Sequence, residues 1–302
     1  MHNLRAILMI IGSMAFFTVE DMFIKQLSTA MPVAEVLLLI CIGCAAIFTI
    51  WALLRRDRIF TARNWRPMIL LRASTEAVGS IAFVTALSRV EISTVGAVFQ
   101  SMPLVVTLGA AVFLKERVGW RRWSAIFVGF IGVLMIIRPG FSAFEPQALW
   151  VLVAVVAVAA RDLMTRVMDV AVPSTVVSMQ AYLAVLPAAL LALWVSGAPP
   201  VAPDLTLSGM LVIAMLAGTL GYALIVSGMR LGDASAVTPF RYARLVFTMI
   251  GGVLVFGERP DVMTYLGSAL IIASGLYSFL RERKLARLDR DMLMADLEAP
   301  RV

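Results

Sequence analysis

The sequence predicts an all-α polytopic membrane protein in which ten transmembrane helices form two inverted five-helix repeats around a central cavity. Three observations lead to this fold class: the composition, the spacing of apolar stretches and an internal duplication. Hydrophobic residues make up 61% of the 302 residues, charged residues only 15%, and the mean hydropathy is +0.93. Soluble domains carry about 25% charged residues, so we expect most of this chain to lie in a lipid bilayer.

Ten apolar stretches have the length of bilayer-spanning helices, which need ~20 residues. The first resembles a secretory signal peptide but lacks a small-residue cleavage site, so we expect the protein to retain it. We expect residues 1–140 to form the first repeat, 141–282 the second and 283–302 a cytoplasmic tail. The predicted spans are 4–26, 32–54, 67–88, 93–114, 120–137, 146–166, 174–196, 206–228, 235–256 and 262–280.

The duplication consists of matching residues about 141–142 positions apart, in spans and in loops alike. The matches are Asp21 with Asp162, Lys25 with Arg166, Pro32 with Pro173, Gly79 with Gly221, Ser93 with Ser235, Val95 with Val237, Gly109 with Gly251, and Glu116-Arg117 with Glu258-Arg259. Because five is an odd number, the second copy enters the membrane from the opposite side and is inverted. Inverted repeats around a site near the bilayer midplane recur among secondary transporters.

Basic residues predict the orientation in the membrane. With the N-terminus in the cytoplasm, 18 of the 26 Lys and Arg residues fall in cytoplasmic segments and four, Lys25, Arg89, Arg138 and Arg259, in external ones. The positive-inside rule then places both termini in the cytoplasm of a bacterial-type inner membrane. Since these residues lie in short loops and not on one face, the net charge of +7 does not indicate a nucleic-acid partner.

Residues that other function classes require are scarce in this sequence. Cys41 and Cys44, the only cysteines, share one turn of the second span and are interpreted as packing residues. The single histidine, His2, cannot form a zinc cluster, and there is no Walker motif. We therefore expect no cofactor or metal and no enzymatic activity. A channel would need a polar ring repeated around a pore, which the sequence does not supply.

Ionisable residues inside the spans are costly in a bilayer and therefore mark candidate functional positions. Arg72 and Glu76 are four residues apart and are expected to pair on one helix face. Arg161 and Asp162 are adjacent, and we expect them to find partners on other helices or to reach the cytoplasmic interface. Glu20 and Asp21 could form an external gate, tie helices together or contact the substrate. The remaining ionisable residues in the spans are Glu35, Arg241 and Arg244.

The ninth span carries the densest group of such residues. Arg241 and Arg244 share a helix face, follow Thr238 and Pro239, and have no acid on their own helix. A guanidinium binds a carboxylate in bidentate fashion, so either arginine could take a substrate carboxylate or pair with an acid of another helix. The equivalent positions of the fourth span are Phe99, Gln100, Met102 and Pro103. The cavity is therefore expected to be apolar on one side and cationic on the other.

Two segments resemble the repeat ends of the drug/metabolite transporter superfamily, EamA type. They are Phe113 to Arg117 followed by Trp120 to Gly132 and Arg138-Pro139-Gly140, and Phe256 to Pro260 followed by Tyr265 to Gly267 and Ile271 to Gly275. The resemblance covers roughly residues 4–282. It implies a cavity lined mainly by the third, fourth, eighth and ninth helices, and export of amino acids or related metabolites.

The run Ala236 to Tyr242 also resembles a proteobacterial subgroup that includes S-adenosylmethionine and riboflavin carriers. This chain departs from that subgroup at two positions: Ile40 stands where an arginine is expected in the second helix, and Arg244 where some relatives carry an acid. The main hypothesis is an inner-membrane secondary carrier that exports amino acids, aromatic and other neutral ones included, with broad specificity by alternating access. The alternative is uptake of a cofactor-like metabolite such as riboflavin or S-adenosylmethionine. The expected partners are a small-molecule substrate and the lipid bilayer, with the carrier a monomer or a dimer.

The substrate zwitterion is expected to place its carboxylate at Arg241 or Arg244 and its ammonium at Glu76. The candidates for the rest of the wall are Val78, Ala82, Phe99, Met102, Thr238 and Tyr242.

The asymmetry of basic residues yields a topology prediction. Tags fused to either end are expected to resist external protease in intact cells and to be cleaved after the cells are opened. A C-terminal tag that is cleaved in intact cells would contradict the even number of spans.

Overall fold

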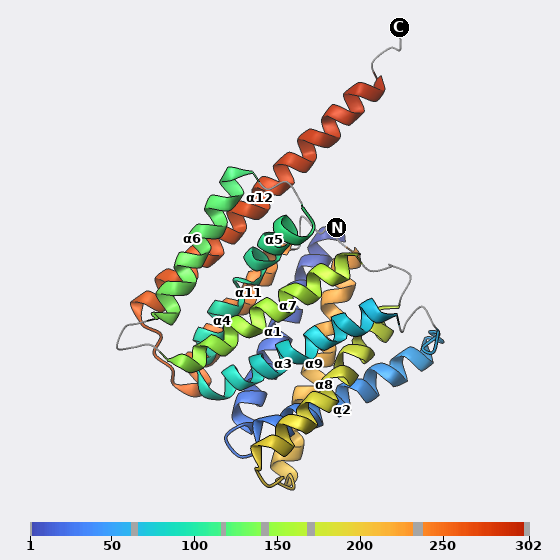
Figure 1. Cartoon of the computed structure of the whole chain (residues 1–302), viewed down its shortest axis with the longest axis vertical. Helices are drawn as coiled ribbons and strands as arrows, with labels where there is room; N and C mark the ends of the chain where they lie inside the picture. Colours follow the sequence, from blue (N-terminus) through green and yellow to red (C-terminus); the bar gives the residue numbers. More distant parts are fainter. Residues whose placement is uncertain are drawn as a thin grey trace.

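The computed structural model describes residues 2–61, 66–115, 119–139, 145–167, 173–231 and 238–298, and in these ranges the chain folds into helices without a strand (Figure 1). The elements are α1 (His2–Leu27), α2 (Val33–Leu54), α3 (Pro67–Arg89), α4 (Ile92–Phe99), α5 (Met102–Phe113), α6 (Trp120–Ile137), η2 (Pro146–Ala148), α7 (Leu149–Val167), α8 (Ser174–Ser196), α9 (Leu205–Leu231), η3 (Thr238–Tyr242), α11 (Ala243–Phe256) and α12 (Val262–Glu298).

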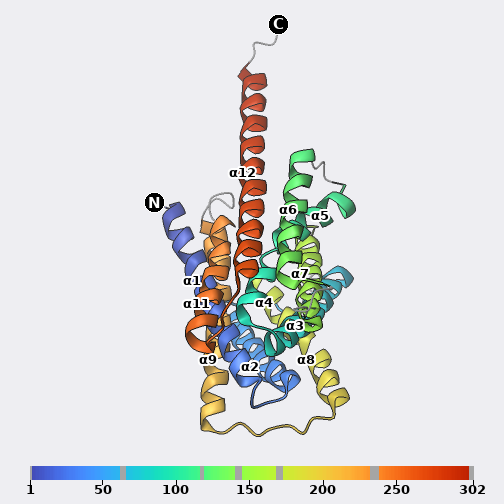
Figure 2. The ribbon, with the colours of Figure 1, turned by 90° about the vertical axis from the view of Figure 1, so that its left-hand side faces the viewer.

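The predicted spans correspond to these helices one for one. Within the described ranges, nine helical segments are long and apolar enough to cross a membrane, and Trp123–Ile137 is a tenth, shorter apolar helix. The fourth span consists of α4 and α5, and the ninth consists of η3 and α11. Because the number of spans is even, both termini come to the same end of the bundle, as Figure 2 shows, and α12 continues well beyond the other helices.

The helix packing has an approximate two-fold symmetry. Helices α2 and α8, and likewise α6 and α12, are repeat equivalents, and each of these pairs packs together. The equivalent fourth and ninth spans also pack together, through α4 and α11. The contacts of α1 with α9 and of α3 with α7 exchange with each other when the repeats are exchanged. Among the described helices, these contacts thus either map onto themselves or have a repeat-related counterpart, as expected for a duplicated chain.

Glu258 shows directly that the repeats run in opposite directions. Its carboxylate follows the end of α11 and accepts hydrogen bonds from the backbone N–H groups of Ile92 (2.6 Å) and Ser93 (3.0 Å) and from Ser93 Oγ (2.7 Å) at the start of α4. The end of the ninth span therefore meets the beginning of the fourth, so these equivalent spans are antiparallel. The ammonium of Lys25 lies 3.6 Å from the same carboxylate. Glu116, the repeat mate of Glu258, lies outside the described residues.

At the same end of the bundle, Arg138 at the end of α6 pairs with Asp261 in front of α12. Asp261 also accepts hydrogen bonds from the backbone N–H and the hydroxyl of Thr264, both at 2.9 Å. These bonds, chiefly the one from Arg138, lower the pKa of the Asp261 carboxyl to about 2. Further along the same two helices, Gly132 and Gly267 bring the backbones together, because a Cβ on either glycine would lie 2.6 Å from the carbonyl oxygen of the other.

Both spans that face each other across the symmetry axis are interrupted at equivalent places. α4 ends at Phe99 and α5 begins at Met102, while η3 ends at Tyr242 and α11 begins at Ala243. Pro103 stands in the first turn of α5, where its missing N–H costs no helical hydrogen bond. The two interruptions are joined, since the Gln100 side-chain amide donates to the Arg241 carbonyl oxygen at 2.9 Å. Arg241 and Arg244 lie at the interruption of the ninth span.

The role of Glu258 as a cap of α4 leads to a stability prediction. Glu258→Gln removes the charge and presents an NH₂ group to three donors, so we expect the free energy of unfolding to fall by ~1.5–3 kcal/mol while substrate affinity stays unchanged. Thermal unfolding of the purified protein and a binding measurement check this. Glu145→Gln, which changes an exposed acid in the same way, is the control. Normal stability together with lost affinity would refute the structural role.

Candidate functional site

A cavity with two lobes lies between the repeats. The broad lobe has a volume of about 570 Å³ and the narrow lobe about 420 Å³, within the range of ~300–1,000 Å³ that is usual for small-molecule sites. They join, because the residues that line both are Phe17, Phe99, Met102, Asp162, Thr165, Ile225, Arg241 and Arg244.

The narrow lobe lies nearer to the end of the bundle that carries the termini. Along α1 it contacts Met14 and Phe17, whereas the broad lobe contacts α1 from Phe17 to Ile24. On α12 it reaches Ser278, beyond the middle of the membrane-spanning part. The opposite end of the bundle carries the contacts of Glu258 and Asp261 described above.

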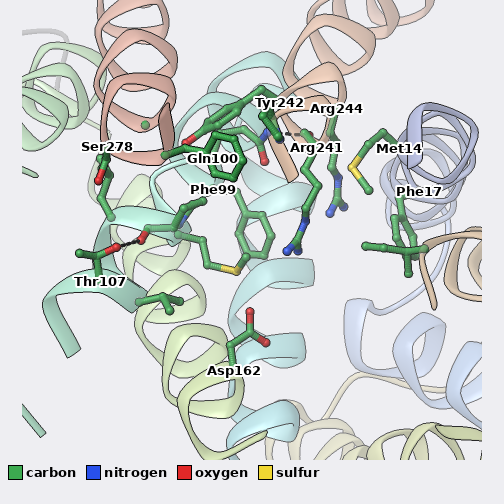
Figure 3. A pocket seen from close by; sticks show the side chains of 18 of the residues that line it. Met14, Phe17, Phe99, Gln100, Thr107, Asp162, Arg241, Tyr242, Arg244 and Ser278 are labelled. Atoms are coloured by element: carbon green, nitrogen blue, oxygen red, sulfur yellow. Dashed lines mark hydrogen bonds between the residues drawn. The ribbon is translucent and has the colours of Figure 1, made fainter. Parts of the chain in front are cut away.

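Arg241 and Arg244 reach the cavity from the interruption of the ninth span. Arg241 belongs to η3 and Arg244 to the first turn of α11, three residues later. Figure 3 shows both guanidinium groups extending into the cavity from this segment, with Asp162 on the wall below them. The sequence prediction that these two arginines share a face is confirmed.

Arg244 is held by an acid and by aromatic rings. Its guanidinium lies 2.7 Å from an Asp21 carboxylate oxygen, and the Asp21 side chain is only 4% exposed. The guanidinium also lies 5.4 Å from the ring centre of Phe17 and 5.5 Å from those of Phe83 and Phe99, distances at which cation–π attraction operates. Arg244 therefore ties α1 of the first repeat to α11 of the second.

A second charge cluster joins α3 to α7. The Arg161 guanidinium lies 2.7 Å from Glu76 and 2.8 Å from Asp162. Arg72 lies 3.9 Å from Glu76, and its Nε donates to the Thr165 hydroxyl at 2.8 Å. The predicted Arg72–Glu76 pair is confirmed as a long contact, while the shorter partner of Glu76 comes from the other repeat.

Two ionisable groups of the broad lobe have no such partner among the residues that the structure describes. The Arg241 guanidinium makes no ion pair there, although the backbone carbonyl of Arg241 accepts the bond from Gln100. Glu20 likewise has no ion pair or hydrogen bond to a described residue, and it lies beside Gly218 of α9. One basic and one acidic side chain of the cavity are thus without an ion-pair partner among the described residues.

Most of the predicted site residues line the cavity. Arg241, Arg244, Glu76, Phe99 and Met102 line the broad lobe, and Tyr242 lines the narrow lobe. The side chain of Thr238 lies outside the described part of the chain.

Val78 and Ala82, which were expected in the apolar wall, do not line either lobe. Glu76, Gly79, Ser80 and Phe83 form the face of α3 that lines the broad lobe. Val78 is two residues beyond Glu76, ~200° around the helix, and its side chain is 53% exposed on the outside of the bundle. Ala82 lies ~240° around from Glu76 and is buried between helices.

The sequence interpretation of Arg161 and Asp162 needs a further correction. Arg161 finds Glu76 on another helix, as expected, but it also bonds to Asp162, since its guanidinium has donors enough for both carboxylates. Tyr182 and Tyr222, which line the broad lobe, were not among the predicted residues. An aromatic residue in an apolar span gives no signal of whether it faces a cavity or lipid.

The fold and the cavity define a membrane transport protein with inverted repeats. The model of the EamA-like transporter family matches residues 4–138 and 146–280, so the chain belongs to this family of the drug/metabolite transporter superfamily. Each of the two matched segments covers one half of the helix bundle.

Similar proteins include carriers with different named substrates. The chain is 28% identical over 225 residues to an S-adenosylmethionine uptake transporter of Rickettsia bellii, covering 74% of this chain and 76% of the relative. It is 32% identical to a riboflavin transporter of Rhizobium johnstonii, in an alignment that covers 74% of this chain and 72% of the relative. It is 26% identical to a pseudopaline exporter of Pseudomonas aeruginosa, covering 85% and 90%. A crystal structure, 21% identical, matches with a TM-score of 0.59 over 93% of this chain and 98% of its own.

The different surroundings of the two arginines lead to a stability prediction. Arg244→Gln leaves the buried Asp21 unpaired and should lower the free energy of unfolding by ~3–5 kcal/mol, as for other broken buried pairs. Arg241→Gln removes a guanidinium without an ion-pair partner and should not lower it. Thermal unfolding of the two variants, which have the same chemical change, measures the difference. Equal destabilisation would mean that Arg241 is structural as well.

Proposed function

We propose that this protein is a secondary carrier for small zwitterionic metabolites that bear an α-amino-acid group, and that its physiological activity is amino-acid export. The observation that carries the proposal is the unpaired Arg241 guanidinium in a cavity between inverted repeats. A buried guanidinium costs ~2.5–3.5 kcal/mol on insertion scales, and a substrate carboxylate can compensate this cost by a bidentate contact.

Broad specificity follows from the remaining walls of the cavity. Phe17, Phe83 and Phe99 stack around Arg244, while Met102 and Val185 add flexible and apolar surface to the broad lobe. Such walls discriminate weakly between side chains, because one methylene in an apolar pocket changes the free energy by only ~1–3 kcal/mol. The size of the two lobes suits large amino acids, including aromatic ones.

Alternating access is the transport mode that the architecture supports. Inverted repeats allow two packings in which the halves exchange roles, so that a site near the midplane faces either side in turn. We propose that residues 1–140 and 141–282 act as these halves, with residues 283–302 as a tail. The positive-inside pattern supports an inner-membrane orientation with both termini in the cytoplasm. The carrier would work as a monomer or a dimer.

The second candidate is uptake of S-adenosylmethionine. Two observations favour it: the 28% identity to the uptake transporter of Rickettsia bellii, and a cavity larger than an amino-acid group alone requires. S-adenosylmethionine carries an α-amino-acid group, so it would use the same arginine. Riboflavin has neither a carboxylate nor an ammonium, and its recognition would leave Arg241 unpaired.

A counterflow assay in proteoliposomes tests the proposed substrate class. We expect labelled neutral and aromatic amino acids to accumulate against the unlabelled compound, and Arg241→Gln to reduce this ~10-fold or more, the loss expected for a charge-assisted hydrogen bond. Amino-acid amides lack the carboxylate and should be affected far less by the substitution. S-adenosylmethionine and riboflavin are measured in parallel.

The outcome assigns the substrate. Accumulation of riboflavin alone would refute the proposed class, and accumulation of S-adenosylmethionine without amino acids would favour the second candidate. For the direction, cells that overproduce an exporter become resistant to toxic amino-acid analogues, whereas cells that overproduce an uptake carrier become more sensitive.

A further inference from the structure

We propose that Glu20 binds the cationic group of the substrate in the lobe that Arg241 also lines. This inference rests on the proposed function and assigns the second charged contact of the same site. It also replaces the sequence-based expectation that Glu76 receives the substrate ammonium.

The ion pairs of the cavity leave Glu20 as the acid that is available. The broad lobe is lined by four acids and four arginines. Asp21 pairs with Arg244, and Glu76 and Asp162 both pair with Arg161. Among the described residues this leaves one acid, Glu20, and one base, Arg241, without an ion pair. A zwitterion supplies the missing opposite charge to each of them.

The position of Glu20 suits a binding role better than a structural one. Glu20 lies on α1 one turn beyond Phe17, and both residues line the broad lobe with Arg241. Its carboxylate lies against Gly218 of α9, where a Cβ would be 2.4 Å from Oε1. Gly218 thus leaves the space that the carboxylate occupies, but it offers no side chain to bind it. A half-buried carboxyl group that lines the cavity without a protein donor can accept hydrogen bonds from a ligand, and a ligand ammonium supplies up to three donors.

Glu76 is less suited to the ammonium. Its carboxylate is already within 2.7 Å of the Arg161 guanidinium and 3.9 Å of that of Arg72. A substrate ammonium would have to displace a guanidinium or share a carboxylate with two cations. Glu20 needs neither rearrangement.

Three related compounds separate the two charged contacts in transport. A free amino acid has both charges, its amide has only the ammonium, and its N-acetyl derivative has only the carboxylate. Glu20→Gln is expected to reduce transport of the amino acid and the amide ~10-fold or more and to spare the N-acetyl derivative. Arg241→Gln is expected to reduce transport of the amino acid and of the N-acetyl derivative, which carry the carboxylate, and to spare the amide. Glu145→Gln, at an exposed acid outside the cavity, is the control for the same chemical change.

A labelling measurement on the unmodified protein does not depend on the folding of a variant. A hydrophobic carbodiimide modifies carboxyl groups inside membrane proteins, and mass spectrometry locates the modified residue. We expect the amino acid and its amide to protect Glu20, and the N-acetyl derivative to give little protection. Gly218→Ala, which pushes the carboxylate aside but keeps its charge, should weaken binding of the ammonium-bearing compounds in the same direction.

The outcomes distinguish this inference from the function on which it rests. If the unmodified protein transports neither amino acids nor S-adenosylmethionine, the proposed function is wrong and the inference falls with it. If it transports amino acids but Glu20→Gln affects all three compounds equally, only the assignment of Glu20 is overturned. The assignment of Glu20 is also overturned if the amide does not slow the labelling of Glu20 by the carbodiimide.

Discussion

Charges inside a bilayer must be compensated within the protein, and this constraint organises the centre of the molecule. An isolated Arg or Asp near the middle of a spanning helix costs ~2.5–3.5 kcal/mol on insertion scales. Two ion pairs that line the cavity, Asp21 with Arg244 and Glu76 with Arg161, each join a residue of the first repeat to one of the second. The same contacts that make the charges tolerable therefore hold the halves of the bundle together around a polar cavity.

The two repeats have the same helix arrangement, but they differ in the residues that they contribute to the cavity. Asp21 and Asp162 occupy equivalent positions, and both line the broad lobe. The positions equivalent to Arg241 and Arg244 are Phe99 and Met102, which line the same lobe from the other repeat. Symmetry thus brings equivalent residues to one cavity, and at these two positions one copy contributes arginines where the other contributes an aromatic and an apolar residue.

The spans and their pairing could be predicted from the sequence because they depend on local and repeated signals. Apolar length sets each span, and an odd number of spans in each repeat sets the inversion that the Glu258 contacts with α4 demonstrate. The family resemblance was predicted from the two repeat ends and is confirmed by the family match.

The partners of the charged residues could be predicted only in part, because they depend on the rotation of each helix about its axis. Val78 illustrates the difficulty: it lies only two residues beyond Glu76, yet this shift turns its side chain ~200° away from the cavity face that carries Glu76 and Ser80. For Arg244 the sequence left two alternatives open, a substrate carboxylate or an acid of another helix. The structure shows that it pairs with Asp21, which could be identified only once the position of α1 against α11 was known.

The balance of charge in the cavity bears on the proposal that the substrate is a zwitterion. With all eight groups ionised, the four acids and four arginines of the broad lobe carry no net charge. A zwitterion adds none, so the loaded and the empty cavity have the same net charge while its two ends satisfy Arg241 and Glu20. A substrate with a net charge would add an uncompensated charge to the site, and the transmembrane potential would act on its passage by ~2.3 kcal/mol per charge at 100 mV. Under the proposed alternating-access mechanism, the conformational change would then move no net charge with a zwitterionic substrate.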